Sequence, residues 1–545
     1  IVGESGSGKS LTAKALMGLL PPTADISRGK ALFRGPNGLA DIAEMDAPAL
    51  QMLRGKQIAM IFQEPMSSLS PFHTIGAQVQ EALRLHFGTG GRRARERVLQ
   101  EFEHVGFPNP IRAYNAYPFE LSGGLRQRAM IAMAMICRPQ ILIADEPTTA
   151  LDVSTQAVIL ELIDRLRAET GMSVLLITHD LGIVANSARF VTVFNKGRVM
   201  EAGETADILT SPEHPYTQRL IAAAPTLDAT LATKRDTGPD PVPGRPNAPD
   251  LILWGHDIEK TYESRSGGIW NKQETIHALT GVDFRLPRGK TLALVGESGS
   301  GKTTLAKIAM HAETADPGAT ILYDPGDGSC GGKGPVSVTE LEGAELRAFR
   351  RQVQMVFQDP FASLSPRMTV HDILCEPLEI HAVDIPELTK PKERTQRAAA
   401  LLRRVGLPEE ALQRFPHAFS GGQRQRISIA RALALEPRLL ICDEPTSALD
   451  VSVQAQVLDL LETLQSEMGL SYLFISHDLA VVARLADEIA VMCRGTVVER
   501  APTERLFKAP QHPYTQALMA AVPEPDPTKL LDIATVAKGA GAEPE

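Results

Sequence analysis

Residues 292–303 read LALVGESGSGKT, a short apolar run followed by Gly-x-x-x-x-Gly-Lys-Thr. This is the pattern of a phosphate-binding P-loop, which joins a β-strand to an α-helix. Glycines let the backbone curl so that several N–H groups face one concavity, and the helix that starts there adds the positive end of its dipole. Lys302 would reach the β- and γ-phosphates of a nucleotide, and the hydroxyl of Thr303 would bind Mg²⁺.

The chain contains this motif twice and repeats five others in the same order. GESGSGKS at 3–10 returns as GESGSGKT at 296–303, and IFQEP at 61–65 returns as VFQDP at 356–360. The other pairs are LSGGLRQR at 121–128 and FSGGQRQR at 419–426, ADEPTTALD at 144–152 and CDEPTSALD at 442–450, THD at 178–180 and SHD at 476–478, and HPYTQ at 214–218 and 512–516. Six segments recurring in one order indicate two homologous halves.

The repeats and the composition between them predict the organisation of the chain. Residues 226–250 are rich in Pro, Gly and Asp and read as a linker. We therefore expect a first domain at 1–225, a second at 251–503 and a C-terminal extension at 504–545. Short apolar runs alternate with helical stretches, which is typical of an α/β fold with a mainly parallel sheet. Residues 92–104 and 394–405 read as parts of an inserted helical subdomain.

Composition excludes several classes of protein. The chain has 545 residues, 43% hydrophobic and 22% charged, so it is not largely disordered. Its 56 basic and 65 acidic residues give a net charge of −9, which does not favour coating nucleic acid or anionic lipid. No apolar run approaches the roughly 20 residues of a membrane helix. The five cysteines form no CxxC pair, which argues against a zinc module or an iron–sulfur cluster and fits a reducing compartment; they are Cys137, Cys330, Cys375, Cys442 and Cys493.

Acidic pairs follow an apolar strand in each half. Asp145 and Asp443 would lie at the edge of the phosphate site and hold a Mg²⁺-bound water, and Glu146 and Glu444 could polarise the attacking water. A turn or a helix start would explain one such pair, but two pairs, each more than a hundred residues after a P-loop, favour the catalytic interpretation.

Other polar residues recur at strand ends. Gln63 and Gln358 follow apolar runs, and their amides could bind Mg²⁺ or the attacking water. His179 and His477 follow β-type runs after both acidic pairs. A histidine there is often a surface residue, but this repeated spacing favours a hydrogen bond to the γ-phosphate.

The SGG runs, Ser122–Gly124 and Ser420–Gly422, begin helices and give each half a second anion-binding helix N-terminus. Each half then has two phosphate-binding ends and one expected nucleotide. A head-to-tail pairing of the halves would resolve this, although the spacing alone does not provide that geometry.

The combination of P-loop, Gln loop, LSGG, acidic pair, ALD and switch histidine resembles the ATPase subunits of ABC transporters. The resemblance covers nearly the whole chain. It implies two tandem domains, each with a RecA-like core, an inserted helical subdomain and an antiparallel β arm, which pair within one chain around two ATP molecules with Mg²⁺. Asp152 and Asp450 would be the D-loop residues at the interface.

The resemblance also implies the site residues. The catalytic residues would be Glu146, Glu444, His179 and His477. The metal ligands would be Ser10, Gln63, Asp145, Thr303, Gln358 and Asp443. The nucleotide would also contact Gly3, Glu4, Ser5, Gly6, Ser7, Gly8 and Lys9 in one loop, Gly296, Glu297, Ser298, Gly299, Ser300, Gly301 and Lys302 in the other, the signature residues Ser122, Gly123, Gly124, Ser420, Gly421 and Gly422, and Tyr262.

Further motifs narrow the resemblance to the oligopeptide, dipeptide and nickel import group. They are SSLSP at 67–71, ASLSP at 362–366, DVSTQA and DVSVQA after ALD, and HPYTQ. The group implies an ATPase that powers import through two membrane permease subunits, with an extracytoplasmic solute-binding protein and no nucleic acid, as a peripheral protein on the cytoplasmic face of the inner membrane. Short peptides are the expected cargo, with nickel chelates or other small solutes as alternatives.

In this family, helices of the permease dock beside the Gln loop. The contact would involve residues 64–72 and 359–367, with the apolar side chains Met66, Leu69, Phe72, Phe361 and Leu364 as the best candidates unless these pack internally. A different function would be a soluble ABC ATPase that acts as a nucleotide-switched module on ribosomes or DNA.

The first half begins at its P-loop, whereas in the second half Tyr262 precedes the loop and could stack on adenine. Ile1 and Val2 resemble the end of a strand. We expect the parent polypeptide to have roughly 30 more residues before Ile1, which would supply strands and a stacking aromatic residue.

Overall fold

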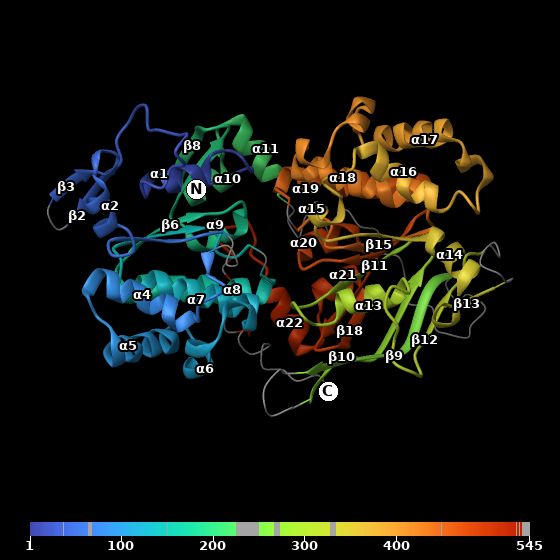
Figure 1. Cartoon of the computed structure of the whole chain (residues 1–545), viewed down its shortest axis with the longest axis horizontal. Helices are drawn as coiled ribbons and strands as arrows, with labels where there is room; N and C mark the ends of the chain where they lie inside the picture. Colours follow the sequence, from blue (N-terminus) through green and yellow to red (C-terminus); the bar gives the residue numbers. More distant parts are fainter. Residues whose placement is uncertain are drawn as a thin grey trace. The chain divides into compact units, whose positions relative to one another are not determined.

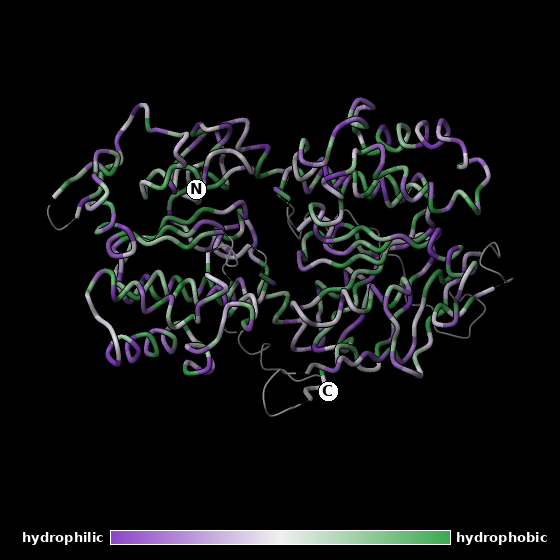
Figure 2. Tube along the Cα trace, viewed as in Figure 1, coloured by the Kyte–Doolittle hydropathy of each residue, from purple (hydrophilic) through white to green (hydrophobic). Residues whose placement is uncertain are grey.

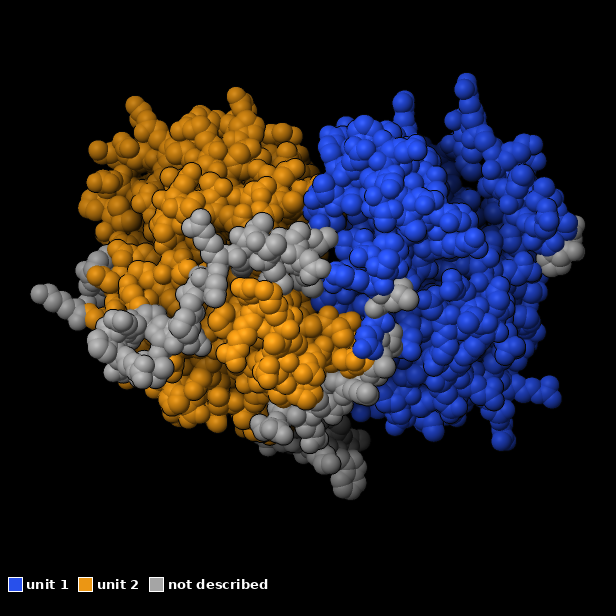
Figure 3. Space-filling model, turned by 180° about the vertical axis from the view of Figure 1, so that it is seen from behind, with its two compact units in different colours: residues 1–224, 521–533 blue, residues 225–520, 534–545 orange. Residues whose placement is uncertain are grey.

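The structure is a computed structural model and describes residues 1–35, 38–63, 68–149, 151–224, 250–265, 273–326, 334–447, 449–529, 531–532 and 535–536. Two compact units divide the chain. Unit 1 comprises residues 1–224 and 521–533, and unit 2 comprises residues 225–520 and 534–545 (Figure 3). The predicted linker 226–250 lies outside the described residues apart from Asp250. No helix of the described residues is long and apolar enough to cross a bilayer.

Unit 2 is built on a six-stranded sheet in which the first five strands run parallel. In spatial order, the strands are β14 (Val353–Val356), β15 (Leu439–Asp443), β16 (Ser471–Ile475), β11 (Thr291–Val295), β17 (Glu488–Cys493) and β18 (Thr496–Pro502). The β arm is a second, antiparallel sheet with the order β10 (Gln273–Pro287), β9 (Leu251–Arg265), β12 (Thr320–Tyr323) and β13 (Val336–Ser337).

Both faces of the parallel sheet of unit 2 are covered by other elements. Alternate residues of each strand point to opposite faces and therefore pack into two different cores. Leu440 and Cys442 pack into a core with the helical subdomain, whereas Leu439 and Ile441 pack into a core with α13 and the β arm. Figure 1 shows these two layers, and Figure 2 shows the apolar residues concentrated along the strands. The helices are α13 (Lys302–Ala309), α14 (Gly343–Gln352), α15 (Pro360–Ser363), α16 (Val370–Ile380), α17 (Pro391–Arg404), α18 (Gly421–Ala432), α19 (Val451–Met468), α20 (Leu479–Leu485), α21 (Thr503–Lys508) and α22 (Pro513–Ala520).

Unit 1 repeats the core of unit 2, with a first strand of 2 residues where β11 has 5. Its strands are β4 (Ile58–Ile61), β5 (Ile141–Asp145) and β6 (Ser173–Ile177) in one sheet and β1 (Val2–Gly3), β7 (Phe190–Asn195) and β8 (Arg198–Glu204) in another. The two sheets join at Ile1, whose amino group donates to the Leu176 carbonyl at 2.7 Å and whose carbonyl accepts from Thr178 N–H at 3.2 Å. The strand order therefore matches that of unit 2, with β1 in the place of β11.

The remaining elements of unit 1 flank these strands. A hairpin is formed by β2 (Leu32–Gly35) and β3 (Gly38–Asp41). The helices are α1 (Lys9–Leu16), α2 (Ala47–Leu53), α4 (Ile75–Phe87), α5 (Gly91–His104), α6 (Pro110–Asn115), α7 (Gly123–Met135), α8 (Val153–Thr170), α9 (Leu181–Ser187), α10 (Thr205–Thr210) and α11 (Pro215–Ala223). The α/β fold and the helices predicted at 92–104 and 394–405 are confirmed, since α5 and α17 occupy those stretches.

A segment from the far end of the chain completes unit 1. The carbonyl oxygen of Pro523 lies so close to Gly182 on α9 that an added Cβ would be 2.3 Å away from it. One turn further along α9, Asn186 Oδ1 accepts a hydrogen bond from Leu531 N–H at 2.9 Å. The absence of a side chain at Gly182 and the amide at Asn186 therefore both help to seat this segment, through Pro523 and Leu531.

The corresponding helix of unit 2, α20, has different residues at these two positions. Ala480 stands in the place of Gly182, and Arg484 stands in the place of Asn186. Arg484 forms ion pairs with Asp459 and Glu462 on α19. These two positions therefore differ between α9, which contacts the C-terminal segment, and α20, which forms ion pairs with α19.

Gly182→Ala should displace the C-terminal segment from unit 1. Alanine is favoured over glycine inside a helix by roughly 0.5–1 kcal/mol, so α9 itself should persist. The new Cβ would meet the Pro523 backbone, and amide hydrogen exchange of residues 521–529 should become faster. Ala480→Gly in α20 is the matched control and should leave that exchange unchanged. Equal exchange rates in the Gly182→Ala protein and the parent protein would contradict this packing.

Candidate functional site

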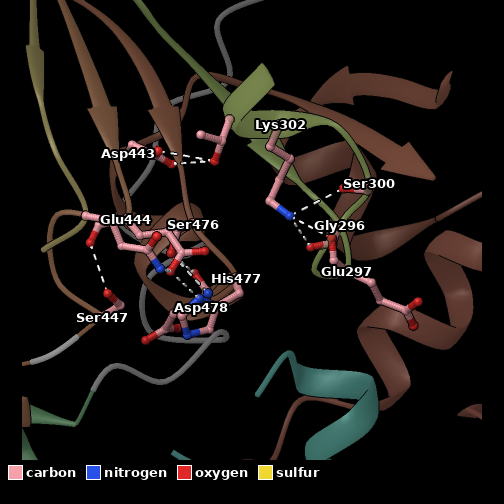
Figure 4. Close-up of polar contacts among 12 residues, drawn as sticks. Gly296, Glu297, Ser300, Lys302, Asp443, Glu444, Ser447, Ser476, His477 and Asp478 are labelled. Carbon is pink, nitrogen blue, oxygen red and sulfur yellow. Dashed lines mark hydrogen bonds and ion pairs between the residues drawn. The ribbon is translucent and has the colours of Figure 1, made fainter. Parts of the chain in front are cut away.

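Each P-loop connects the end of a central strand to a helix and is closed by its own lysine. In unit 2, Lys302 Nζ donates to the carbonyls of Gly296 and Glu297, both at 2.8 Å, and to Ser300 Oγ at 3.3 Å (Figure 4). In unit 1, Lys9 Nζ donates to the carbonyls of Gly3 and Glu4 at 2.6 and 3.0 Å. Both lysines are buried, so their charge lies inside the curve of the loop.

The first glycine of each loop is required by a close backbone approach. Gly296 has φ +147°, and a Cβ there would lie 2.1 Å from the Met492 carbonyl oxygen on β17. Gly3 meets Phe194 on β7 in the same way, at 2.2 Å. No other residue fits this position, because any side chain would separate the loop from the neighbouring strand.

The first acid of each pair contacts the hydroxyl that follows the P-loop lysine. Ser10 Oγ donates to Asp145 Oδ1 at 3.0 Å, and Thr303 Oγ1 lies 3.2 and 3.3 Å from the carboxylate oxygens of Asp443. Burial raises the pKa of both aspartates, and the hydroxyl hydrogen bonds offset part of that rise. Two hard oxygen donors are thus brought together beside each P-loop.

The second acid of each pair has an unusual backbone conformation. Glu146 and Glu444 have φ values of +49° and +46°, a region that non-glycine residues rarely adopt. Their N–H groups donate at 2.9 Å to the carbonyls of Ile177 and Ile475, which lie on the adjacent strand. The strain turns each carboxylate away from the strand and toward the edge where the other site residues lie.

The predicted glutamine and histidine both reach this second acid. Gln63 Nε2 donates to Glu146 Oε2 and Gln358 Nε2 to Glu444 Oε2, each at 2.8 Å. His179 Nδ1 lies 3.4 Å from Glu146, and His477 Nδ1 lies 3.1 Å from Glu444. In each unit, the structure therefore brings the P-loop, the acidic pair, the glutamine and the histidine to one edge of the sheet.

The charges in unit 2 are mutually dependent. Burial opposes ionisation of Glu444, but His477, Lys302 and the Gln358 amide outweigh it and hold the pKa of this carboxyl below its ordinary value. Burial alone would lower the pKa of His477, but the hydrogen bond and the charge of Glu444 raise it above its ordinary value. The pair therefore favours a carboxylate beside an imidazolium. The pKa of Glu146 is also lowered, because His179 and Thr149 outweigh its burial.

Several residues that position the site were missed in the sequence. Thr149 Oγ1 donates to Glu146 Oε2 at 3.0 Å. Asp180 caps α9 by accepting the N–H groups of Gly182 and Ile183, and its own N–H donates to Thr178 Oγ1 at 3.0 Å. These contacts fix the turn that carries His179. The signal was present, since the whole triplet THD recurs as SHD, with Asp478 in the same capping role.

The signature serines cap the helices that follow them. Ser122 accepts from Leu125 N–H and Ser420 from Gln423 N–H, each at 3.4 Å. In unit 2, the Gln423 side chain also accepts from Ser420 N–H at 3.1 Å and completes a capping box, which Leu125 does not provide in unit 1. The sequence difference after SGG therefore changes the cap and leaves the helix start in place.

The last glycine of the signature is needed for packing between helices. A Cβ on Gly422 would lie 2.2 Å from Val453 Cγ1 on α19, and one on Gly124 would lie 2.8 Å from Thr155 Cγ2 on α8. The D-loop residues Asp152 and Asp450 occupy the N-cap positions of these same helices. Signature and D-loop are thus packed together within each unit.

Tyr262 lies on β9. Its side chain is 37% exposed, its hydroxyl donates to Glu313, and the Lys260 ammonium lies 5.3 Å from the ring centroid. An exposed ring beside a cation is compatible with a stacking role.

The segments expected to contact a membrane partner are only partly exposed. Leu69 and Leu364 are 3% and 1% exposed, so the expectation that they contact a partner is wrong; they pack in the helical cores of their own units. Phe72 and Phe361 are 84% and 60% exposed. Met66 lies outside the described residues.

No cluster of three or more His, Cys, Asp or Glu side chains in the described part of the chain has the arrangement of a metal site. Cys137, Cys375, Cys442 and Cys493 are buried thiols without disulfides, and Cys330 lies outside the described residues.

Comparison with known proteins gives consistent matches along the chain. The family model described as "ABC transporter" matches residues 1–149 and 279–447, and "Oligopeptide/dipeptide transporter, C-terminal region" matches 200–249 and 498–544. The glutathione import ATP-binding protein GsiA of Pectobacterium atrosepticum is 44% identical over 97% of this chain and 85% of its own length. The peptidoglycan transport ATP-binding protein YejF of Agrobacterium fabrum is 46% identical over 96% of this chain and 90% of its own. A solved dimeric ATP-binding cassette bound to ADP and phosphate is 28% identical, covers 46% of this chain and 99% of its own, and has a TM-score of 0.39.

The pKa of His477 should fall when Glu444 is replaced by Gln. The carboxylate supplies the hydrogen bond and the charge that raise this pKa, and burial opposes them. In the parent protein, the raised pKa contributes stability that is complete below the ordinary histidine value of 6.5 and is lost as the pH rises through the folded value. NMR titration of labelled histidines, with His477→Gln to assign the resonance, measures both values. An unchanged pKa in the Glu444→Gln protein would contradict the pairing.

Proposed function

The chain belongs to the ABC transporter family of ATPases, and from this premise we propose that it hydrolyses Mg-ATP at both of its sites to drive the import of short peptides. It is an ATP-binding import subunit, as its relatives are. The observation that carries the peptide assignment is the oligopeptide/dipeptide C-terminal region, which is matched once in each half. Glutathione is itself a small peptide, and peptidoglycan fragments contain peptides, so the names of both relatives agree with this cargo. A nucleotide-switched role on ribosomes or DNA has no such support.

The oxygen donors of each site fit Mg²⁺. This ion prefers hydroxyl, carboxylate and amide oxygens, and Ser10 with Asp145, or Thr303 with Asp443, provides a hydroxyl against a buried carboxylate. A bound cation would lower the raised pKa of these aspartates, because it would supply the positive charge that their burial lacks. Gln63 and Gln358 complete the proposed ligand sets. The ion would supply charge neutralisation of the transferred phosphate.

Glu146 and Glu444 are the proposed general bases. A base must be ionised to accept a proton from water, and the lowered pKa values of both carboxyls meet this requirement near neutral pH. His179 and His477 stabilise the ionised form and, with ATP bound, would donate to the γ-phosphate. Lys9 and Lys302 would hold the β- and γ-phosphates.

Two ATP molecules would each be enclosed by the P-loop of one half and the SGG motif of the other. This pairing would give each of the four anion-binding helix N-termini a phosphate. Site one would use the P-loop of unit 1 with Ser420, Gly421 and Gly422, and site two the P-loop of unit 2 with Ser122, Gly123 and Gly124. Tyr262 would stack on the adenine of site two.

Two permease subunits and an extracytoplasmic binding protein would complete the importer, with this chain on the cytoplasmic face of the inner membrane. The exposed aromatic rings beside the Gln loops are the proposed permease contacts. Phe72 is almost fully exposed, and the Phe361 ring lies 3.9 Å from the Arg424 guanidinium at the start of α18. A docked permease helix would thus contact both the hinge of the helical subdomain and its signature helix.

The double variant Glu146→Gln, Glu444→Gln should lose nearly all ATP hydrolysis while retaining ATP binding. Loss of a general base reduces the rate by about 10²- to 10⁴-fold, and glutamine preserves the shape of the side chain. Phosphate release measures the rate, and the retention of labelled ATP on gel filtration measures binding. The single variants are the matched controls and report each site in turn. Normal turnover by the folded double variant would remove both residues from the catalytic assignment.

The complex of this chain with its permease and binding protein allows the cargo proposal and the docking proposal to be tested independently. The binding protein that copurifies with the complex should bind di- to pentapeptides in a ligand screen that also contains nickel chelates. The variants Phe72→Cys and Phe361→Cys should form cross-links to the permease. The variants Leu69→Cys and Leu364→Cys are controls at buried positions. Binding of nickel chelates without peptides would overturn the cargo, and the absence of cross-links at both phenylalanines in every nucleotide state would overturn the docking surface.

A further inference from the structure

The HPYTQ motif has no part in the chemistry derived so far, yet the structure gives it a defined place. In unit 2, it forms the start of α22. The His512 ring accepts the Tyr514 N–H at 3.1 Å, and Gln516 Nε2 donates to the Pro510 carbonyl at 3.0 Å. The carboxylate of Glu499, on β18, accepts the N–H groups of Gln511 and His512, both at 2.9 Å. These contacts fix the first turn of α22 against the sheet.

The side chain that this turn positions is that of Tyr514. The tyrosine is 3% exposed, and its hydroxyl accepts a hydrogen bond from Glu297 N–H at 3.0 Å. Glu297 is the second residue of the P-loop, 217 residues earlier in the chain. A residue outside every recognised nucleotide motif therefore contacts the phosphate-binding loop directly.

The contact acts on the same peptide unit as the P-loop lysine. Lys302 Nζ donates to the Gly296 carbonyl (Figure 4). The N–H of the same peptide, that of Glu297, donates to the Tyr514 hydroxyl. The carbonyl and N–H of a trans peptide point in opposite directions, so the lysine on one side and the tyrosine on the other fix the orientation of its plane.

This peptide needs support from outside the loop. Gly296 has no side chain to anchor it, and glycine has the widest backbone freedom of any residue. A rotated peptide would withdraw its carbonyl from Lys302 and release the ammonium group from its present position. A buried hydroxyl with a fixed acceptor position opposes that rotation.

We propose that Tyr514 is a positioning residue for the second nucleotide site, which holds the Gly296–Glu297 peptide and thereby Lys302 in the orientation that binds the β- and γ-phosphates of ATP. Unit 1 repeats the contacts that fix the turn carrying this tyrosine. Glu201 accepts from the N–H groups of Glu213 and His214 at 2.9 and 3.2 Å, and the His214 ring accepts from Tyr216 N–H at 3.1 Å.

The proposal predicts a specific binding defect in Tyr514→Phe. The ring and its packing are kept, and one neutral hydrogen bond is lost, which corresponds to roughly 3- to 10-fold weaker ATP binding. A fluorescent trinitrophenyl-ATP analogue, titrated in a Lys9→Ala background so that only the second P-loop binds, measures the Kd and the number of sites. The Kd should rise with the number of sites unchanged. With native Lys9, the KM for ATP should rise more than kcat falls, because the contact serves bound phosphate before and during the reaction.

Tyr472→Phe is the matched control. Its hydroxyl is also buried in unit 2 but donates to the Leu461 carbonyl at 2.7 Å, so the Kd should stay within about twofold of the parent value. Equal shifts in both variants, an unchanged Kd in Tyr514→Phe, or fewer sites at an unchanged Kd would each overturn the positioning role. Hydrogen exchange of the native chain gives a second test that needs no variant, since rapid exchange of the Glu297 amide would also overturn it.

Discussion

The parallel alignment of neighbouring central strands is the constraint on which the site depends. In unit 2, β14, β15, β16 and β11 lie side by side, and their carboxyl ends meet at one edge of the sheet. Gln358 follows β14, Glu444 follows β15, and His477 follows β16, while the P-loop leaves β11. Each strand contributes at least one polar group at this edge, and the strand order decides which groups become neighbours. Hydrogen bonds between these side chains then fix their orientations at the edge of the sheet.

Most of the polar residues at this edge of the sheet could be predicted from the sequence, because a short motif that occurs in both halves at the same relative position is rarely a chance match. The predicted glutamines and histidines contact Glu146 and Glu444. The hydroxyl residues that follow the P-loop lysines contact Asp145 and Asp443. The α/β fold follows from the same alternation of apolar runs and helices. These features are local in sequence, and a pattern of residue types records them directly.

Features that depend on the path of the backbone could not be predicted in this way. Nothing in the letters of Asp-Glu reveals that Glu146 and Glu444 adopt positive φ, since other residues of their type rarely do. Leu69 and Leu364 look like exposed members of a loop, but the turn that contains them folds each into the helical core. The hydroxyl of Tyr514 reaches Glu297 only because β18 and α22 return to the P-loop. The contact of Leu531 with Asn186 on α9 likewise joins positions 345 residues apart, which no local pattern can reveal.

This contact matters if the two halves are made as separate chains. The first chain would then expose Gly182 and Asn186 on α9, and the second chain would carry the C-terminal segment without the surface of α9 on which it packs. The separated products would have to meet again through that segment. The fused chain makes the meeting intramolecular, and its high effective concentration does not depend on how much of each product the cell makes. Because both ATPase halves are translated as one chain, they are always present in a one-to-one ratio.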